Sequence, residues 1–201
     1  MSADPVTEKE RLRRELKARA LEHSTEDRQP ASSALCQRLL SSPVWRAATS
    51  VLAFYPMRSE PDLRPVLEAA LREGKRLSLP QFVRADDRYH PVLVTELGRD
   101  LIPGVLGIPE PRLECPPVSI NHLDLVLVPG LGFDLGFGRI GRGRGYYDRL
   151  LAGLSGGKKC GVAFDWQIVS AVPMQAHDVP VDFLVTPTRW LSRVIGELGC
   201  E

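Results

Sequence analysis

The sequence predicts an α/β protein of one domain, built on a mostly parallel sheet with helices on both faces in the Rossmann-like three-layer arrangement. Short apolar runs, of which Leu123 to Val128 is the clearest, alternate along the chain with segments whose apolar residues recur at helical spacing. Such alternation is typical of strands that helices bury on both faces. No internal repeat, linker or low-complexity segment divides the 201 residues, so we expect a single domain over residues 1–201.

Capping and spacing signals predict the helices. Thr7 and Glu10 form a T-x-x-E capping box, and the apolar positions that follow predict a first helix that is rich in lysine and arginine. Ser24-Thr25 should start a second helix, and Ser41-Ser42-Pro43 should end it. Helices are expected over residues 7–20, 24–40, 62–71 and 146–154, with Gly74 as the C-cap of the third.

Apolar runs between these helices predict the strands. They are expected over residues 49–55, 76–79, 89–94, 123–128, 160–164 and 183–186. The middle of the chain, residues 81–119, is rich in proline and turn residues. We expect one or two strands there within a long excursion.

The composition excludes several classes of protein. Lysine and arginine number 26 against 25 aspartates and glutamates, so the net charge gives no support for a nucleic-acid partner. No apolar run approaches the roughly 18 residues that a membrane span needs. Met1 to Pro5 lead directly into charged residues, unlike a signal peptide, and the four cysteines are widely separated without metal-binding spacing. We therefore expect a cytoplasmic protein with reduced thiols and no nucleic-acid or membrane partner.

The most informative stretch runs from Pro129 to Asp148 and reads P-G-L-G-F-D-L-G-F-G-R-I-G-R-G-R-G-Y-Y-D. We call residues 129–145 the glycine–arginine loop, because its glycines alternate with three arginines, Arg139, Arg142 and Arg144. Glycine lets the backbone approach a ligand closely, and free N–H groups beside a helix start attract anions. Guanidinium groups pair bidentately with phosphate oxygens. The pattern predicts a polyphosphate site at the carboxyl end of a strand.

Three other interpretations of this loop carry less weight. A flexible surface loop with solvated arginines fits poorly, because a strong strand and a Tyr-Tyr-Asp helix start bound the segment. Gly136, Gly138 and Gly141 spell the dinucleotide pattern G-x-G-x-x-G, with Asp165 at roughly the right distance. That pattern should begin directly at the strand end, whereas residues 129–135 intervene here. The chain has no G-x-x-x-x-G-K-[ST], so a P-loop fold is not indicated.

The run G-L-G-F-D-x-x-G-x-R-[LI]-G-R-G-x-G-Y-Y-D in this stretch resembles the signature of the 5-formyltetrahydrofolate cyclo-ligases, also called methenyltetrahydrofolate synthetases. Ile140 stands where the family usually has leucine, an exchange between apolar residues of similar size. Further segments follow in the family's order, namely K-E-R-L-R at 9–13, F-Y-P-M-R-S-E at 54–60, L-G-I-P-E-P at 106–111, Ala163-Phe164, Gln167, Pro173 and His177-Asp178 to Asp182. The resemblance covers nearly the whole chain, although residues 190–201 carry no family signal.

The resemblance implies that ATP binds to the basic first helix and to the glycine–arginine loop. The implied ATP-binding residues are Lys9, Glu10, Arg11, Leu12, Arg13, Arg139, Ile140, Gly141, Arg142, Gly143, Arg144, Gly145, Tyr146 and Tyr147. Lys9 and Arg13 lie four apart on one helical face and can both reach phosphates, whereas Arg11 is expected at the surface. Arg142 is the implied catalytic residue, because the loop carries more arginines than nucleotide anchoring needs.

The resemblance also implies a magnesium site. Asp148 and Asp178 are the implied ligands, since Mg²⁺ on a nucleotide takes one or two carboxylates beside phosphates and water. Asp182 is an alternative to Asp178, because both belong to the segment H-D-V-P-V-D. Asp148 also falls in the first turn of a helix, where the helix dipole stabilises a carboxylate.

Tyr55, Glu60 and Tyr146 are the implied folate contacts. A carboxylate can accept hydrogen bonds from the N–H edge of a pterin, and an aromatic ring can stack on it. The implied reaction is ATP-dependent closure of 5-formyltetrahydrofolate to 5,10-methenyltetrahydrofolate with release of ADP and phosphate. Positioning and charge neutralisation should dominate such catalysis, as in other phosphoryl transfers.

Two other functions stay open from the residues alone. A phosphosugar isomerase-like enzyme should need an acid–base pair beside the phosphate loop, and none is evident in the sequence. A non-catalytic nucleotide-binding module could dispense with Glu60 and the distal aspartates, which are present here. We expect small-molecule substrates and a monomer, with a dimer as the alternative.

Overall fold

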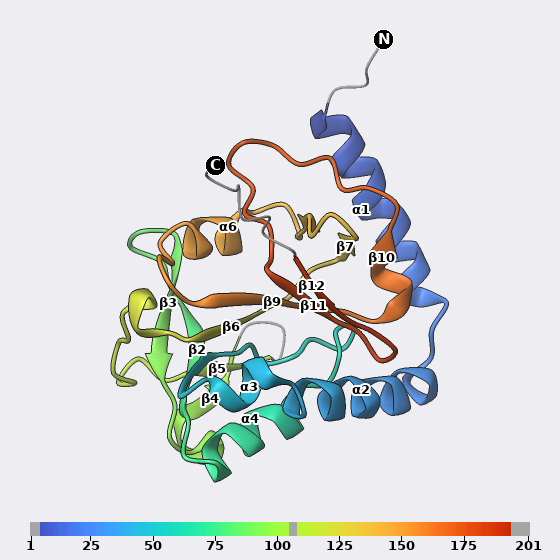
Figure 1. The fold of residues 1–201 in the computed structure, drawn as a ribbon. Helices are drawn as coiled ribbons and strands as arrows, with labels where there is room; N and C mark the ends of the chain where they lie inside the picture. The colour runs from blue at the N-terminus through green and yellow to red at the C-terminus, as the bar shows by residue number, and fades with distance from the viewer. Residues whose placement is uncertain (1–4, 105–107, 194–201) are drawn as a thin grey trace, which may run out of the picture.

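The computed structural model describes residues 5–104 and 108–193, and Figure 1 shows a central sheet between helices. The helices are α1 (Pro5–Leu21), α2 (Thr25–Leu40), α3 (Pro43–Ala47), α4 (Arg64–Arg72), α5 (Leu97–Asp100) and α6 (Tyr146–Leu151). The strands are β1 (Ser50–Leu52), β2 (Arg76–Val83), β3 (Arg88–Leu93), β4 (Leu101–Pro103), β5 (Pro109–Pro111), β6 (Leu125–Val128), β7 (Gly132–Asp134), β8 (Arg139–Ile140), β9 (Lys158–Val162), β10 (Ile168–Val169), β11 (Phe183–Val185) and β12 (Trp190–Ser192).

The central sheet has seven strands in the order β12-β11-β9-β6-β1-β2-β3. The five inner strands run parallel, and the edge strands β3 and β12 pair antiparallel with their neighbours. From β1 the chain moves to β2 on one side, and it later returns to β6 on the other side of β1. Connections therefore leave β1 and β6 in opposite directions, and such a switch point is where open α/β sheets bind ligands. The predicted fold class is confirmed.

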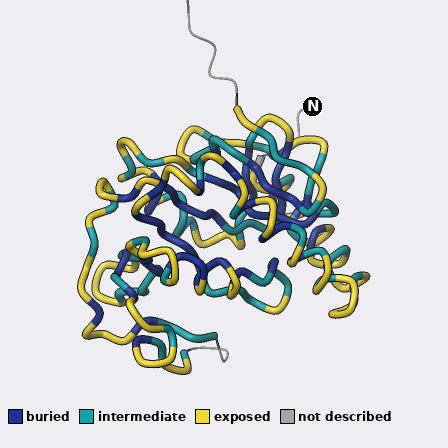
Figure 2. Tube along the Cα trace, turned by 60° about the horizontal axis from the view of Figure 1, so that its bottom comes forward, coloured by how far each residue is buried: buried dark blue, intermediate teal, exposed yellow. Residues whose placement is uncertain are grey.

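Helices cover both faces of this sheet (Figure 1). On one face, Leu39 of α2, Trp45 of α3 and Leu67 of α4 pack into a core in which each is at most 1% exposed. On the other face, Val128 of β6 packs with Leu151 of α6. Figure 2 shows that the buried residues run through the interior of the chain trace, while many exposed residues lie on its outer turns. Within the described ranges, no helix is long and apolar enough to cross a membrane.

A smaller unit stands at the edge of this layered core. Strands β10, β7 and β8 form a three-stranded sheet, and α1 lies beside β10 in Figure 1. Leu12 and Leu16 of α1 pack with Leu131, Ile140 and Val172 in a third apolar cluster. This cluster fixes the basic helix α1 against the glycine–arginine loop, which contains β7 and β8.

The predicted helices and strands are found, with ends that shift by a few residues. The second helix has the expected N-cap, since Ser24 Oγ accepts from the Asp27 N–H and the Asp27 carboxylate accepts from the Ser24 N–H. The cap predicted at Thr7 is wrong, because α1 is already helical at Pro5, a residue suited to the first turn. The short elements α3, α5, β4, β5, β7, β8, β10 and β12 were not predicted.

Candidate active site

A cleft of about 740 Å³ opens at the switch point of the sheet. Phe54 and Tyr55 follow β1 into its wall, and Pro129 and Gly130 follow β6. Of the predicted ATP-binding residues, the wall includes Lys9, Glu10, Arg13, Arg139, Ile140, Gly141, Arg142, Gly143, Arg144, Gly145, Tyr146 and Tyr147. Tyr55, Glu60, Asp148 and Asp178 line the same cleft, so the structure brings these predicted residues together.

Two predicted residues are placed elsewhere by the helical period of α1. Arg11 is exposed and pairs with Glu15 one turn along the helix. Leu12 is 8% exposed and belongs to the apolar cluster beneath α1. Lys9 and Arg13, in contrast, share the face that meets the cleft.

Asp134 organises the first half of the glycine–arginine loop. Its Oδ1 accepts from the Gly138 N–H at 2.8 Å, and its Oδ2 accepts from the Val172 N–H at 2.7 Å. A Cβ on Gly138 would lie 2.9 Å from Asp134 Oδ2, so glycine is needed for this close approach. The buried carboxylate thus ties the β7–β8 turn to the segment after β10, a role that the sequence did not reveal.

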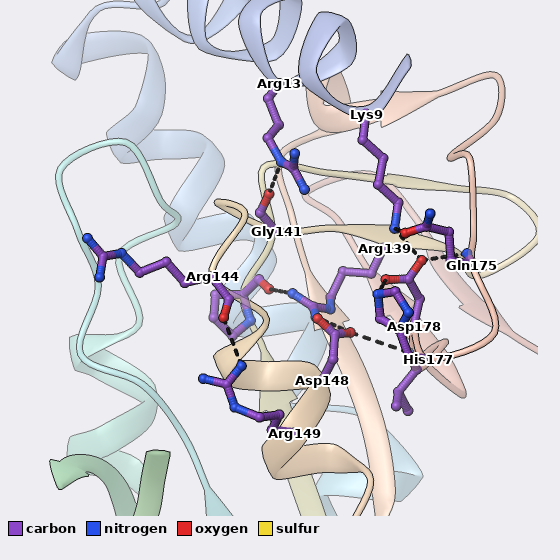
Figure 3. A network of polar contacts seen from close by, with 12 residues as sticks. Lys9, Arg13, Arg139, Gly141, Arg144, Asp148, Arg149, Gln175, His177 and Asp178 are labelled. Carbon is purple, nitrogen blue, oxygen red and sulfur yellow. Dashed lines mark hydrogen bonds and ion pairs between the residues drawn. The ribbon is translucent and has the colours of Figure 1, made fainter. Parts of the chain in front are cut away.

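The second half of the loop brings arginine side chains together with α1 and α6 (Figure 3). Arg139 is 4% exposed and donates from Nη2 to Asp148 Oδ1 at 2.7 Å. Arg13 donates from Nε to the Gly141 carbonyl at 3.1 Å, across 128 residues of sequence. Gly143 adopts φ +105°, a backbone conformation that side chains rarely adopt. The loop is therefore held against the cationic helix in a backbone conformation that Gly143 permits.

Lys9 reaches the far side of the cleft, as Figure 3 shows. Its Nζ lies 2.5 Å from Asp178 Oδ2 and 3.1 Å from Gln175 Oε1. Burial favours a higher pKa for Asp178, but hydrogen bonds from Lys9 and from the Gln175 N–H outweigh it and leave the pKa below its ordinary value. Asp178 is therefore ionised at neutral pH and holds Lys9 in place.

Glu60 links the loop after β1 to the glycine–arginine loop. Its side chain is 9% exposed, and its Oε1 lies 3.2 Å from Arg142 Nη2. Its Oε2 accepts from the Met57 N–H at 3.0 Å, which fixes the carboxylate. Arg142 also donates to Ser59 Oγ at 3.3 Å. The implied folate and ATP subsites therefore meet at the ion pair between Glu60 and Arg142.

An aromatic wall lies next to Glu60. Phe82 and Tyr89 of the β2–β3 hairpin contact Tyr146 with ring centroids 5.1 and 5.3 Å apart, and Tyr147 lies 6.0 Å from Tyr89. Burial raises the pKa of Tyr147 well above its ordinary value, and the charge of Glu60 acts in the same direction. Tyr147 is thus a neutral packing surface rather than an acid.

Several residues that line the cleft were not predicted as site residues from the sequence. Phe82, Tyr89 and Glu110 come from the proline-rich middle of the chain, and Gln175 comes from the segment after β10. Tyr89 carries a usable signal, because it lies in the strand that the sequence predicts over residues 89–94. No comparable signal marks Gln175.

Asp148 and Asp178 have the donor chemistry of a nucleotide-bound magnesium site. Both are hard oxygen ligands on the wall of one cleft that is rich in phosphate-binding groups. Within residues 5–104 and 108–193, no group of three or more His, Cys, Asp or Glu side chains could hold a metal by itself. The pair therefore fits an ion that takes its remaining ligands from phosphates and water. Asp182, the alternative ligand, is bound to Lys159 instead, 3.0 Å from its Nζ.

The fold and the cleft define a class of protein: an α/β protein with a cationic glycine loop and an aromatic, carboxylate-bearing wall at the switch point of its sheet. The model of the 5-formyltetrahydrofolate cyclo-ligase family matches residues 5–187, and the chain belongs to this family.

Individual relatives agree with this assignment. The 5-formyltetrahydrofolate cyclo-ligase of Escherichia coli K12 is 31% identical over 173 residues, covering 82% of this chain and 92% of the relative. That of Mus musculus is 28% identical, covering 85% of this chain and 89% of the relative. The NMR structure of Aquifex aeolicus 5,10-methenyltetrahydrofolate synthetase superposes with a TM-score of 0.83 at 34% identity, covering 96% of both chains.

Proposed function

We propose that the protein catalyses the ATP-dependent cyclisation of 5-formyltetrahydrofolate to 5,10-methenyltetrahydrofolate, with release of ADP and phosphate. Membership of the cyclo-ligase family supports this proposal. The structural observation that carries it is the meeting of two unlike walls in one cleft. Cations of the glycine–arginine loop and α1 face Glu60 and the aromatic wall, which suits a polyphosphate beside a flat heterocycle.

The phosphates of ATP would bind between α1 and the glycine–arginine loop. Lys9 and Arg13 supply charge from the helix, and Arg139 and Arg142 supply it from the loop. Arg139 is already oriented by Asp148, so its guanidinium loses little freedom when a phosphate arrives. We assign Arg142 to the transferred phosphoryl group, because it contacts Glu60, the carboxylate on the folate side of the cleft.

Mg²⁺ would be held by Asp148 and Asp178 together with the phosphates. The ion neutralises phosphate charge when bound. Asp178 is paired with Lys9, and Asp148 with Arg139, so each carboxylate also positions a cation of the phosphate site. The ion pairs fix the orientation of both carboxylates, whose oxygens are the ligands that Mg²⁺ prefers.

Folate would bind against the aromatic wall. Tyr55 and Tyr146 offer ring surface to the pterin, and Glu60 accepts a hydrogen bond from it. Because Glu60 contacts Arg142, this arrangement brings the N5 substituent of the folate next to the phosphoryl group that Arg142 binds. Reacting groups held in this way gain the rate advantage of an intramolecular process.

The reaction balances in two steps. The oxygen of the N5-formyl group attacks the γ-phosphorus of ATP and displaces ADP, which leaves an iminium carbon bearing a phosphate ester. N10 then attacks this carbon and loses its proton to solvent, and the carbon–oxygen bond to phosphate breaks. Lys9, Arg13, Arg139 and Arg142 neutralise charge on the phosphoryl oxygens throughout. No side chain of the cleft has to act as nucleophile.

The proposal is tested by an absorbance assay for the methenyl product. Purified protein should form it from 5-formyltetrahydrofolate only with ATP and a divalent cation, and should release ADP rather than AMP. Full-rate product formation without nucleotide would refute the proposal, and AMP release would refute the phosphoryl-transfer step. An exposed-site variant, Arg38→Ala, serves as the matched control for arginine variants of the loop. Cytoplasmic location and the monomeric state stay predictions from the sequence.

A further inference from the structure

The β4–β5 hairpin brings a second carboxylate to the cleft. Strands β4 and β5 pair antiparallel, with Ile102 opposite Glu110. The side chain of Glu110 is half-buried and lines the cleft together with Tyr89 and Glu60. No role for Glu110 follows from phosphate binding, since a carboxylate repels phosphate.

The hairpin holds Glu110 in a defined position. Gln81 of β2 donates from Nε2 to the carbonyls of Pro111 at 3.4 Å and Arg112 at 2.7 Å, which ties β5 to the central sheet. Gly104 lies directly behind Glu110, because a Cβ at Gly104 would come within 2.4 Å of the glutamate Cδ. The bare backbone of Gly104 therefore leaves space for the Glu110 side chain where a larger residue would displace it.

The electrostatics of the aromatic wall agree with this placement. Burial raises the pKa of Tyr89, and the charges of Glu110, Tyr146 and Glu60 raise it further, in that order of size. Glu110 and Glu60 thus both act on the ring of Tyr89. Glu60 in addition pairs with Arg142 of the glycine–arginine loop.

We propose that Glu110 is a specificity-determining residue, whose carboxylate accepts hydrogen bonds from the N3–H and 2-amino group of the pterin. This inference rests on the proposed function. The N5-formyl group must face the phosphoryl group near Arg142, so Glu60 stands at the reactive end of the pterin. The N3 and 2-amino donors lie at the opposite end of the fused ring, and we assign them to Glu110, the other carboxylate beside Tyr89. Two parallel N–H donors match the two oxygens of one carboxylate, as in a guanidinium–carboxylate pair.

Calorimetry and turnover with Glu110→Gln test the inference. Glutamine keeps the size of the side chain but presents an NH₂ group to the 2-amino donor, so both the affinity for 5-formyltetrahydrofolate and kcat/KM for it should fall about ten- to a hundredfold. The KM for ATP should change less than about twofold, because the phosphate site is untouched. Glu114→Gln, the same substitution at an exposed position nearby, should match wild type.

A 2-deamino analogue of 5-formyltetrahydrofolate provides the decisive comparison. Wild type should bind the analogue about ten- to a hundredfold more weakly than the natural substrate, and Glu110→Gln should discriminate between the two less than about threefold. Equal discrimination by both enzymes would overturn the inference. If Glu110→Gln fails to fold, Glu110→Asp, which withdraws the carboxylate by one methylene, should show reduced discrimination instead.

The two proposals fail separately in these measurements. Turnover by wild type with undiminished folate affinity in Glu110→Gln would refute the role of Glu110 and leave the proposed function standing. Binding of 5-formyltetrahydrofolate that depends on Glu110, without any methenyl product, would refute the proposed function and support the contact. Absence of both binding and turnover in wild type would refute both.

Discussion

The ion pair between Glu60 and Arg142 predicts that the folate and nucleotide subsites compete for one arginine. In the structure Arg142 Nη2 lies 3.2 Å from Glu60 Oε1, across 82 residues of sequence. A phosphate that binds Arg142 must draw it away from this carboxylate. We therefore expect Glu60→Gln to strengthen ATP binding in the absence of folate, while it weakens folate binding.

The size of the effect follows from the exposure of the two partners. Glu60 is 9% exposed and Arg142 is 42% exposed, so solvent screens the pair only from one side. Exposed ion pairs contribute about 0.2–1 kcal/mol, and hydrogen bonds to charged groups about 1.5–3 kcal/mol. A value of about 1 kcal/mol, at the upper end of the range for exposed pairs, corresponds to roughly a fivefold gain in ATP affinity. Glutamine can still accept from the Met57 N–H, so the loop should keep its shape.

Calorimetry with a non-hydrolysable ATP analogue on four proteins measures this coupling: wild type, Glu60→Gln, Arg142→Ala and the double variant. The gain from Glu60→Gln should fall below about twofold in the Arg142→Ala background, because no guanidinium remains to be released. Weaker ATP binding in Glu60→Gln would refute the competition. So would a gain of the same size in both backgrounds, which would reflect only the lost negative charge.

Three further changes have defined outcomes. Arg142→Ala should lower kcat as well as raise the KM for ATP, with about ten- to a hundredfold lost in kcat/KM. Arg142→Lys should recover little of this loss, because lysine lacks the planar guanidinium group that binds two oxygens at once. A near wild-type kcat of the lysine variant in steady-state kinetics would contradict this prediction. Gly143→Ala places a side chain on a residue with φ +105°, and roughly 1 kcal/mol of backbone strain should weaken binding of the ATP analogue at least fivefold. Gly156→Ala is the control and should leave this binding unchanged, because a Cβ at Gly156 would meet no atom within 4 Å. Asp124→Asn should destabilise the fold by about 1 kcal/mol at neutral pH after allowance for solvent screening. Hydrogen bonds from Thr49 and the backbone lower the pKa of Asp124 to about 2. The stabilisation by Asp124 is therefore complete above the ordinary aspartate pKa of about 4 and is lost as the pH falls through about 2. Urea unfolding at both ends of that pH window should show the difference in unfolding free energy between wild type and variant disappearing at low pH, and a constant difference would contradict the assignment.

Local signals predicted the layered core well. The run from Leu123 to Val128 contains β6, and Ser24 caps α2 as expected, because burial and capping act within a few residues. The small sheet β10-β7-β8 was not predictable in the same way. Its strands span only two or three residues each, too short for any alternation to emerge, and β7 and β8 lie in a glycine-rich segment.

The candidate site was accessible from the sequence mainly through the family resemblance. Spacing alone places Lys9 and Arg13 on one helix face, and the glycines around Arg142 predict a close approach to an anion. Contacts between segments that lie far apart in the sequence could not be predicted. Lys9 and Asp178 are 169 residues apart, and Glu60 and Arg142 are 82 residues apart, yet the members of each pair contact one another. Such pairings are set by how the segments pack together in three dimensions, and no local pattern encodes them.

The central claim is that ATP phosphorylates the formyl oxygen before the ring closes, and oxygen labelling tests it most directly. 5-Formyltetrahydrofolate labelled with ¹⁸O in the formyl group should be converted by the enzyme with ATP and Mg²⁺, and the released phosphate should be analysed by mass spectrometry. The account predicts one ¹⁸O atom in each phosphate and none in ADP. Unlabelled phosphate, with the ¹⁸O recovered in water, would contradict it.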